Sequence, residues 1–376
     1  MKLAQFTLHR VRIPFKIKFG HAAAMRECSD SVVVLLRSQE GVTGMGECAP
    51  REYVTGETAE SVFAELRSAG PALGNTLEAT EDPVALLRDE LPERMRGNAA
   101  RCAVELAALD LLGKCAGKSL PDLIAKPVVQ TAPRYSSVIG SDSTRGTAVS
   151  ALKMRIYGFQ DVKIKVGISP ERDVKTAKTA RFVLGKGIDI RADANGVWSL
   201  DEAERTLAEL APFGLSCIEQ PLAKDRNDDL PELRRRVGLP VMLDESLCTM
   251  DDATRSVEQG QCDLFNIRIS KCGGLLSSLR MADYAAEHGI GCQLGCQVGE
   301  TGILSAAGRI FSTLVSDLLH LEGSYERHLL ADDITRERVR FGYGGRAEPM
   351  QGHGLGVSLD AEALSRYAED TAEIEM

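Results

Sequence analysis

Three acidic residues stand at regular intervals in the middle of the sequence. Asp193, Glu219 and Asp244 end the apolar runs IDIRAD, LSCIE and PVMLD, and they lie 26 and 25 residues apart. One βα unit takes about 25 residues, so we expect the three carboxylates at the same end of three neighbouring parallel strands. Three oxygen ligands without a nearby His or Cys favour Mg²⁺, followed by Mn²⁺. The alternative is that each acid is an ordinary helix N-cap.

Two lysines lie two positions apart in the run DVKIKVG. Because strand side chains alternate, Lys163 and Lys165 share one face, while Val162, Ile164 and Val166 share the other. The apolar face should meet helices, so both lysines should point into the interior of a barrel. Each ammonium group raises the cost of charging the other, so at least one lysine could accept a proton near neutral pH. The alternative is that they only form ion pairs that fill the barrel.

Lys271 follows a later apolar run, in DLFNIRISKCGG. If this run is the sixth strand of a closed barrel, it lies across from the second, so Lys165 and Lys271 would flank a substrate from opposite sides. Removal of a proton α to a carboxylate creates an enediolate, whose negative charge needs a strong electrophile such as Mg²⁺. Asn195 lies two residues after Asp193, and Glu245 directly follows Asp244. We expect both to contact these acids and help to orient them.

The elements that must position these side chains repeat from about residue 133. Apolar runs typical of strands alternate with helical stretches such as Leu200–Leu210 and Leu275–His288. Eight strands with helices between them predict a closed parallel barrel. A doubly wound open sheet is the alternative, but it lacks a Gly-rich fingerprint after its first strand. The strand candidates are residues 134–139, 161–166, 188–193, 215–219, 240–244, 263–269, 290–294 and 317–322.

The two ends of the chain differ in character from this middle part. Ala4–Ile13 and Ser31–Ser38 predict an antiparallel pair of strands with a loop at Phe19–His21 between them. Residues beyond about 325 contain Gly342–Gly345 and a strand-like Leu355–Leu359, and we expect them to fold back. The predicted organisation is an α+β capping domain of residues 1–130, completed by 325–376, and a barrel of residues 131–324 with the active site. Helices are expected at Glu57–Ser68, Pro83–Leu91 and Asn98–Ala116.

Composition restricts the class of protein. The 376 residues include 45 basic and 54 acidic ones, a net charge of −9, so a nucleic-acid-binding surface is not expected. The ten cysteines are scattered singly, mostly in apolar runs, as in reduced cytoplasmic proteins. The amino-terminal MKLAQFTLHRVRIPF reads as a strand rather than a signal peptide. Because no run reaches the roughly 18 apolar residues of a membrane helix, we expect a soluble cytoplasmic protein.

Taken together, the motifs resemble those of the enolase superfamily, and within it the muconate-lactonizing-enzyme subgroup. AARCAVELAALDLLGKCAGKSLPDLI resembles the signature helix of the capping domain, and DVKIKVG resembles the Lys-x-Lys strand. RADAN, IEQP and LDES resemble the three metal-ligand strands, and NIRISKCGGL the strand of the catalytic lysine. The mandelate-racemase subgroup fits less well because it needs a His at the end of the seventh strand, which here ends CQLGCQ.

The resemblance covers nearly the whole chain and implies an α+β capping domain on a (β/α)7β TIM-like barrel. It makes Asp193, Glu219 and Asp244 the Mg²⁺ ligands. The implied acid/base pair is formed by two of the lysines, with the third in a supporting electrostatic role. These residues are, in that order, Lys165, Lys271 and Lys163.

The substrate is less well specified. Similar dipeptide epimerases have an Asp-x-Asp on the last barrel strand that binds the substrate's ammonium group, whereas this chain has His320-Leu321-Glu322 there. Arg51 would suit a second anionic group on the substrate, although a solvated loop is the alternative. Residues expected to line the pocket are Phe19, His21, Arg51, Tyr53, Glu300 and Glu322.

The predicted function is Mg²⁺-dependent racemisation or epimerisation of an amino-acid derivative or dipeptide, because two opposed lysines suit a 1,1-proton transfer. A lyase or cycloisomerase would use the same acids and lysines; the candidates are an o-succinylbenzoate synthase, a muconate cycloisomerase and a hydroxy-acid dehydratase. A non-catalytic metal-binding barrel would have no need of two buried bases. The expected partners are a small carboxylate substrate and further copies of the chain.

Overall fold

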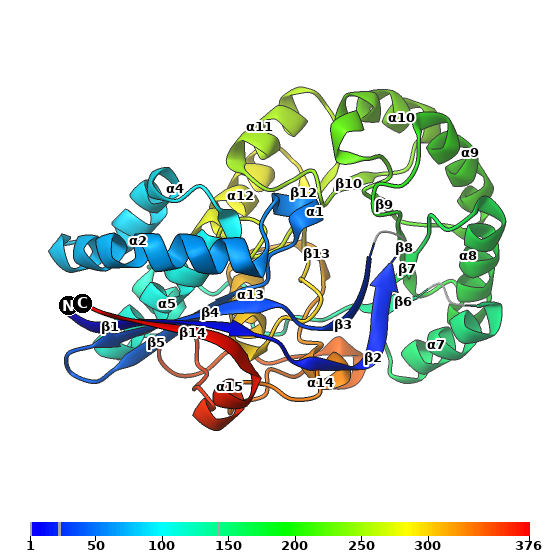
Figure 1. Cartoon of the computed structure of the whole chain (residues 1–376). Helices are drawn as coiled ribbons and strands as arrows, with labels where there is room; N and C mark the ends of the chain where they lie inside the picture. The colour runs from blue at the N-terminus through cyan, green and yellow to red at the C-terminus, as the bar shows by residue number, and fades with distance from the viewer. Residues whose placement is uncertain (1, 22–23, 141–142) are drawn as a thin grey trace.

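The computed structural model describes residues 2–21, 24–140 and 143–376. Its larger part is an eight-stranded parallel sheet that curls around an axis, with helices along its outer side (Figure 1). The strands lie in chain order across the sheet. They are β6 (Ser137–Ile139), β7 (Asp161–Lys165), β8 (Asp189–Asp193), β9 (Ile218–Glu219), β10 (Val241–Leu243), β11 (Leu264–Ile267), β12 (Gly291–Leu294) and β13 (Leu318–Leu321).

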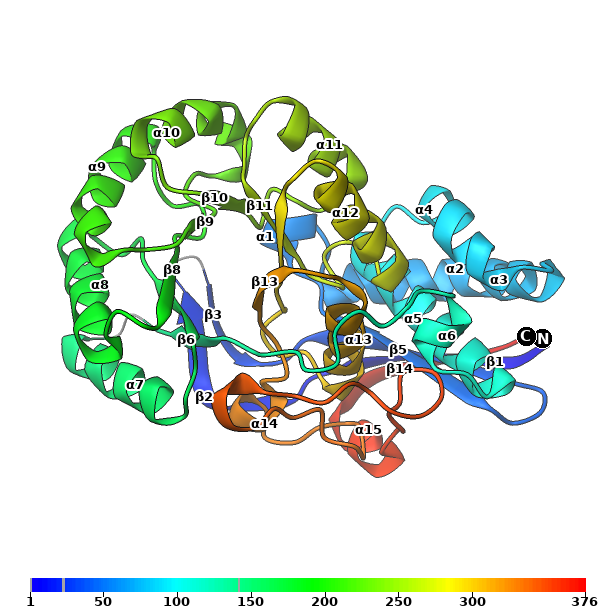
Figure 2. The same cartoon turned by 180° about the vertical axis from the view of Figure 1, so that it is seen from behind.

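The helices that follow the strands form the outer layer of the curled sheet (Figure 2). A Ser or Thr hydroxyl caps the first turn of α7, α8, α9, α11 and α13, which explains why each helix begins where it does. The outer helices are α7 (Thr144–Ile156), α8 (Pro170–Leu184), α9 (Leu200–Leu210), α10 (Leu230–Val237), α11 (Met250–Glu258), α12 (Leu275–Glu287) and α13 (Gly302–Leu314).

Alternation along the strands determines what faces the axis. Val162 and Ile164 of β7 are fully buried in the core, and the lysine between them points to the opposite face. The edge strands β6 and β13 meet through a hydrogen bond of 2.7 Å from the Ser136 amide to the Leu321 carbonyl. The predicted parallel barrel is therefore confirmed.

A second, antiparallel sheet covers one side of this barrel. Its strand order is β14-β1-β4-β5, in which β1 (Leu3–Val11) pairs with β4 (Ser31–Ser38) as predicted. The strand at its edge, β14 (Ala368–Glu375), comes from the carboxyl end of the chain, and the two termini lie side by side (Figure 1). The fourth strand is β5 (Thr43–Cys48), and α2 (Ala59–Ala79) and α5 (Asn98–Ala116) pack on the sheet.

Helix α5 connects the two parts of the molecule. It packs against β5 on one side and against α12 on another, so 14 of its 19 residues are buried. This position explains its apolar composition, because a helix between two layers has little contact with solvent. The remaining helical segments are α1 (Glu52–Thr55), α3 (Pro83–Ala85), η1 (Leu86–Glu90), α4 (Leu91–Arg94), α6 (Leu120–Leu123), η2 (Ala211–Phe213), η3 (Lys224–Asp229), α14 (Glu326–Leu329), η4 (Tyr343–Gly345) and α15 (Ala361–Tyr367).

Two local expectations were wrong. The first concerns Phe19–His21, which is not a loop but the end of β2 (Pro14–His21), and this strand pairs with β3 (Ala24–Cys28). The helix expected at Pro83–Leu91 is present, but it contains the π-helical turn η1 just before Pro92, whose missing N–H cannot continue the α-helical pattern.

The second wrong expectation concerns the tail. Leu355–Leu359 forms no strand beyond one isolated bridge between Leu359 and Thr335. Its first amide, that of Leu355, donates instead to the Asp110 side chain of α5 at 2.8 Å.

No helix in the described part of the chain has both the length and the apolar character needed to cross a membrane.

Candidate active site

Asp193, Glu219 and Asp244 come together at the carboxyl ends of three adjacent strands. Asp193 pairs in register with Glu219, whose neighbour on the other side is Met242, two residues before Asp244. All three side chains are fully buried. The structure thus brings the three predicted metal ligands to the carboxyl rim of the barrel, where barrel enzymes place their chemistry.

Lys165 and Lys271 stand on either side of these acids. The Nζ atom of Lys165, at the end of β7, lies 2.5 Å from Asp193 Oδ2 and 2.9 Å from Asn195 Oδ1. The Nζ atom of Lys271, in the turn after β11, donates to the carbonyl and Oδ1 of Asp244 at 2.6 and 3.0 Å. Burial lowers the pKa of Lys271. Strands β8, β9 and β10 separate β7 from β11, so the two amines approach from opposite walls.

Lys163 lies deeper, beneath the acids. Its Nζ atom is 3.2 Å from Glu219, 3.3 Å from Asp193 and 2.8 Å from Glu322. Burial alone would lower the pKa of Lys163, but these carboxylates together raise it above its ordinary value. These three carboxylate contacts therefore favour the charged ammonium form of Lys163.

Glu322 does not face the rim as expected of a substrate-binding residue. Burial raises its pKa, but Lys163 and Arg191 outweigh burial and lower the pKa to about 2. One of its oxygens lies 2.6 Å from Arg191, and both oxygens contact Lys163. The carboxylate is thus directed into the barrel interior and engaged by two cations.

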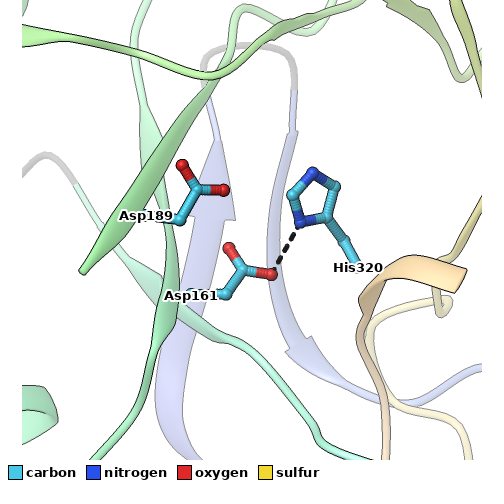
Figure 3. A group of neighbouring side chains, drawn as sticks. All are labelled: Asp161, Asp189 and His320. Atoms are coloured by element: carbon cyan, nitrogen blue, oxygen red, sulfur yellow. Dashed lines mark hydrogen bonds and ion pairs between the residues drawn. The ribbon is translucent and has the colours of Figure 1, made fainter. Parts of the chain in front are cut away.

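A tight group of three potential metal ligands lies at the other end of the barrel. Asp161, Asp189 and His320 place one ligand atom each within 4.8 Å of one another, and His320 Nδ1 is 2.8 Å from Asp161 Oδ2 (Figure 3). However, Asp161 also pairs with the buried Arg191, and Asp189 accepts a hydrogen bond from Ser216. Asp161 and Asp189 are also only partly buried, and the third ligand is an imidazole, so the three fully buried carboxylates of the rim are the better candidate for a hard cation.

The rim acids also fit a hard divalent cation by their chemistry. They offer buried carboxylate oxygens from adjacent strands, which are the ligands that Mg²⁺ prefers. In the structure these charges are balanced by side-chain cations, since Lys165 contacts Asp193, and Arg268 contacts Asp244. Beside them, Glu245 has a buried oxygen with no hydrogen-bond partner, and burial followed by the charge of Asp193 raises its pKa. Such an orphaned oxygen is consistent with a cation site.

Asn195 connects these groups from the loop after β8. Its amide N–H donates to Asp193 Oδ1 at 2.9 Å, and its side chain donates to Glu245 Oε1 at 3.1 Å while accepting from Lys165. Its φ of 49° is in the left-handed region, which Asn tolerates better than most residues. Asn195 and Glu245 therefore lie where the sequence analysis expected them, next to the acids.

Gln220 is a supporting residue that sequence reasoning missed. Its Oε1 accepts from the amides of Asp244 and Ser246, and its Nε2 donates to the Leu222 carbonyl and the Ser246 hydroxyl at 2.8 Å. These four bonds hold its backbone at a φ of 37°, which costs on the order of 1–3 kcal/mol for a residue of this type. The arrangement joins the end of β9 to the loop after β10.

Three more polar residues missed by sequence reasoning face the acids. Asn266 donates to Glu219 at 2.8 Å, Gln293 donates to the same carboxylate at 3.4 Å, and Arg268 contacts Asp244. Asn266 and Arg268 are two positions apart in NIRIS, so the alternation rule that was applied to the lysines of DVKIKVG would have found them.

The loops above the rim contain the other predicted pocket residues. Arg51 is almost fully buried and donates to the carbonyls of Pro50 and Val298, so its guanidinium is engaged by backbone. Tyr53 is 42% exposed on α1, and Glu300 follows β12. Burial raises the pKa of Glu300 to about 8. Phe19 and His21 were also predicted here, but their side chains lie outside the described residues.

The chain matches known proteins over both parts. Residues 4–125 match the mandelate racemase/muconate lactonizing enzyme amino-terminal domain, and residues 147–363 match the enolase carboxyl-terminal domain-like family. A hydrophobic dipeptide epimerase of Enterococcus faecalis is 29% identical over 98% of both chains. An N-succinyl-L-Arg/Lys racemase of Bacillus cereus is 30% identical over 82% of this chain and 83% of its own length.

An o-succinylbenzoate synthase of Bacillus subtilis is 27% identical over 98% of this chain and 97% of its own length. The solved structure of the E. faecalis epimerase, complexed with Mg and the dipeptide L-Leu-L-Tyr, superimposes with a TM-score of 0.85. It shares 26% identity and covers 95% of this chain and 100% of its own. With its barrel, capping sheet and rim of acids and lysines, this chain belongs to the mandelate racemase/muconate lactonizing enzyme family of the enolase superfamily.

Proposed function

We propose that this chain is a Mg²⁺-dependent racemase or epimerase that removes and returns the proton α to a carboxylate. The observation that supports this most is the position of Lys165 and Lys271 on opposite walls, with three buried carboxylates between them. The similar epimerase and racemase support an amino-acid derivative or a dipeptide as the substrate.

The proposed proton transfer needs the two lysines in different protonation states. One lysine, as a neutral amine, accepts the α-proton, and the other, as an ammonium ion, donates a proton to the opposite face of the same carbon. When held by Asp193, Glu219 and Asp244, Mg²⁺ would stabilise the negative charge that develops on the substrate carboxylate. Lys163, which contacts Asp193 and Glu219 from beneath, would balance part of their negative charge.

The similarity to an o-succinylbenzoate synthase supports a lyase as the second candidate. The same rim would then remove one proton, and the substrate would lose a leaving group instead of regaining a proton. The two candidates differ in whether an α-proton returns from solvent.

Three further features belong to the proposal. Mn²⁺ should support the same reaction in place of Mg²⁺, because both ions accept oxygen ligands. A cytoplasmic location is supported by the ten free cysteines, most of them buried. A homo-oligomer is supported by Val149, Leu152 and Ile156 on the outer face of α7, which are 47, 51 and 66% exposed.

A solvent-exchange screen tests the proposed function. The full-length protein with Mg²⁺ is incubated in D₂O with dipeptides, N-acyl and N-succinyl amino acids and hydroxy acids, and α-deuterium is measured in each epimer by NMR. Deuterium in both epimers of one substrate is expected, and chelation of the metal should stop it. Elimination without any deuterated epimer would favour the lyase, and no reaction with any substrate class would overturn the proposal.

A further inference from the structure

The turn that contains Lys271 is held in place by the capping domain. Residues 268–274 connect β11 to α12 and belong to no helix or strand. The position of the Lys271 ammonium therefore depends on contacts with other parts of the molecule. Helix α5 supplies several of them through three polar residues, Asn98, Arg101 and Glu105, which we call the polar stripe. Their spacing of three and four residues places them on one face of the helix.

The polar stripe follows the turn along its length. Arg101 and Glu105 lie so close to it that a Cβ atom at Gly273 would be 2.6 Å from Arg101 Nη2, and one at Gly274 would be 2.4 Å from Glu105 Oε1. These two glycines have φ angles of 85° and 116°, which residues with side chains rarely adopt. Glu105 also accepts a hydrogen bond of 3.0 Å from the Leu276 amide, at the start of α12. The turn is shaped to fit this face of α5.

Asn98 is the member of the stripe that reaches Lys271 itself. Its Nδ2 donates to the carbonyl of Lys271 at 2.8 Å and to that of Cys248 at 2.9 Å, and its Oδ1 accepts from Arg101. Cys248 lies four residues after Asp244, in the loop after β10. Lys271 Nζ also contacts Asp244. The loop after β10 and the turn after β11 are therefore joined twice, by the side-chain amide of Asn98 and by the side chain of Lys271.

We propose that Asn98 is a positioning residue for proton transfer by Lys271. This inference rests on the proposed function and adds to it a dependence of one base on the capping domain. Asn98 acts through the backbone of the turn, not on the substrate. Among the hydrogen bonds of the described residues, those of Lys165 go to Asp193 and Asn195, and none goes to α5. Loss of the side-chain amide of Asn98 should therefore disturb the position of Lys271 and leave that of Lys165 unchanged.

The test variant is Asn98→Asp, with Asn98→Ala as a second one should the first fail to fold. The aspartate retains the size of the side chain, suits a helix amino terminus and can still pair with Arg101, but it cannot donate to the two carbonyls. The matched control is Glu57→Gln. Glu57 accepts from the amides of Ala99 and Ala100 at the same end of α5, at 3.0 and 3.2 Å.

The first readout is α-proton exchange in D₂O, measured separately for the two epimers of a working substrate with Mg²⁺ present. Asn98→Asp should slow exchange on the face served by Lys271 by about 10- to 100-fold and leave the other face near the wild-type rate. Glu57→Gln should leave the ratio of the two rates unchanged. If Asn98→Asp slowed α-proton exchange equally on both faces, Asn98 would have only a general structural role, and the inference would be overturned.

The second readout is backbone amide exchange by mass spectrometry, which needs no substrate. In Asn98→Asp, exchange should be faster in residues 268–276 and unchanged in residues 161–166. Unchanged exchange in residues 268–276 would overturn the role of Asn98. A wild-type protein that exchanges no α-proton would contradict the proposed function alone, since amide exchange would still decide whether Asn98 holds the Lys271 turn.

Discussion

Glu219 is the central one of the three rim acids. Its carboxylate contacts Lys163, Asn266 and Gln293, so it is fixed before any ligand arrives. Glu219→Gln keeps the size of this side chain and removes its charge. We expect it to abolish activity and to weaken Mg²⁺ binding by about 100-fold or more, measured by titration calorimetry. Glu300→Gln, at the same rim but outside the trio, is the control that should retain Mg²⁺ affinity. Full activity of a metal-free protein would contradict the metal assignment.

Lys165 and Lys271 should act on opposite faces of the substrate's α-carbon, so each should exchange the α-proton of one epimer. Lys165→Ala should stop α-proton exchange for one epimer and leave partial exchange of the other, and Lys271→Ala should give the mirror result. Both variants should lose epimerisation, because a complete cycle needs a proton donor and an acceptor on opposite faces. Deuterium content of each epimer, followed by NMR, measures this. Full turnover by both variants would rule out proton transfer by these amines.

Residue type and spacing predicted the acids and lysines because strand alternation and the length of a βα unit are local rules. Gln220 escaped prediction because its role depends on its contacts with the next strand, through Asp244 and Ser246. Glu322 was placed on the correct strand end but given the wrong surroundings. Its pairing with Arg191 and Lys163 depends on three strands meeting inside the barrel, which sequence spacing does not show.

Among the elements, the barrel strands were predicted more reliably than the capping sheet. Each barrel strand contains buried apolar residues that mark it in the sequence, whereas β14 has the sequence AEDTAEIE and an acidic, largely exposed face. Such a strand forms because β1 offers it a partner, and its charges discourage pairing with other chains. The β2–β3 hairpin was likewise missed.

Deletion of residues 368–376 should test the importance of β14. Without it, β1 becomes an edge strand, and we expect the melting temperature to fall by about 5–10 °C together with activity. Calorimetry and a steady-state assay would measure both. Substitution of the exposed Glu369 and Glu373 by Gln keeps the strand and should change neither. If the truncated chain matches the intact one in both measurements, β14 is dispensable.

At the scale of the whole molecule, buried acids join the capping domain to the barrel. Glu105 of α5 accepts from the first turn of α12, and burial raises its pKa from 4.5 to about 8. Because the folded pKa exceeds the unfolded one, the folded state binds the proton more tightly. Stability should therefore fall as the pH rises from about 4.5 to about 8.

Glu105→Gln, which stays neutral at every pH, should remove this part of the pH dependence. The melting temperature of the variant relative to the wild type should increase between pH 5 and pH 8, followed by calorimetry. Glu209→Gln, at an exposed position of α9, is the control and should show no such trend. Parallel curves for Glu105→Gln and the wild type would show that Glu105 is not the group responsible.

The pairing of β1 with β14 has a consequence for how the protein is made. Gln5 faces Glu375 in this ladder, so β1 must wait for a partner that is synthesised far later in the chain. At roughly 5–20 residues per second, that interval is on the order of 20–70 s. The barrel strands, whose partners are close in the sequence, can assemble during this time. The capping sheet is complete only once β14 has been synthesised, and until then the free edge of β1 is open to chaperones or to unwanted strand pairing.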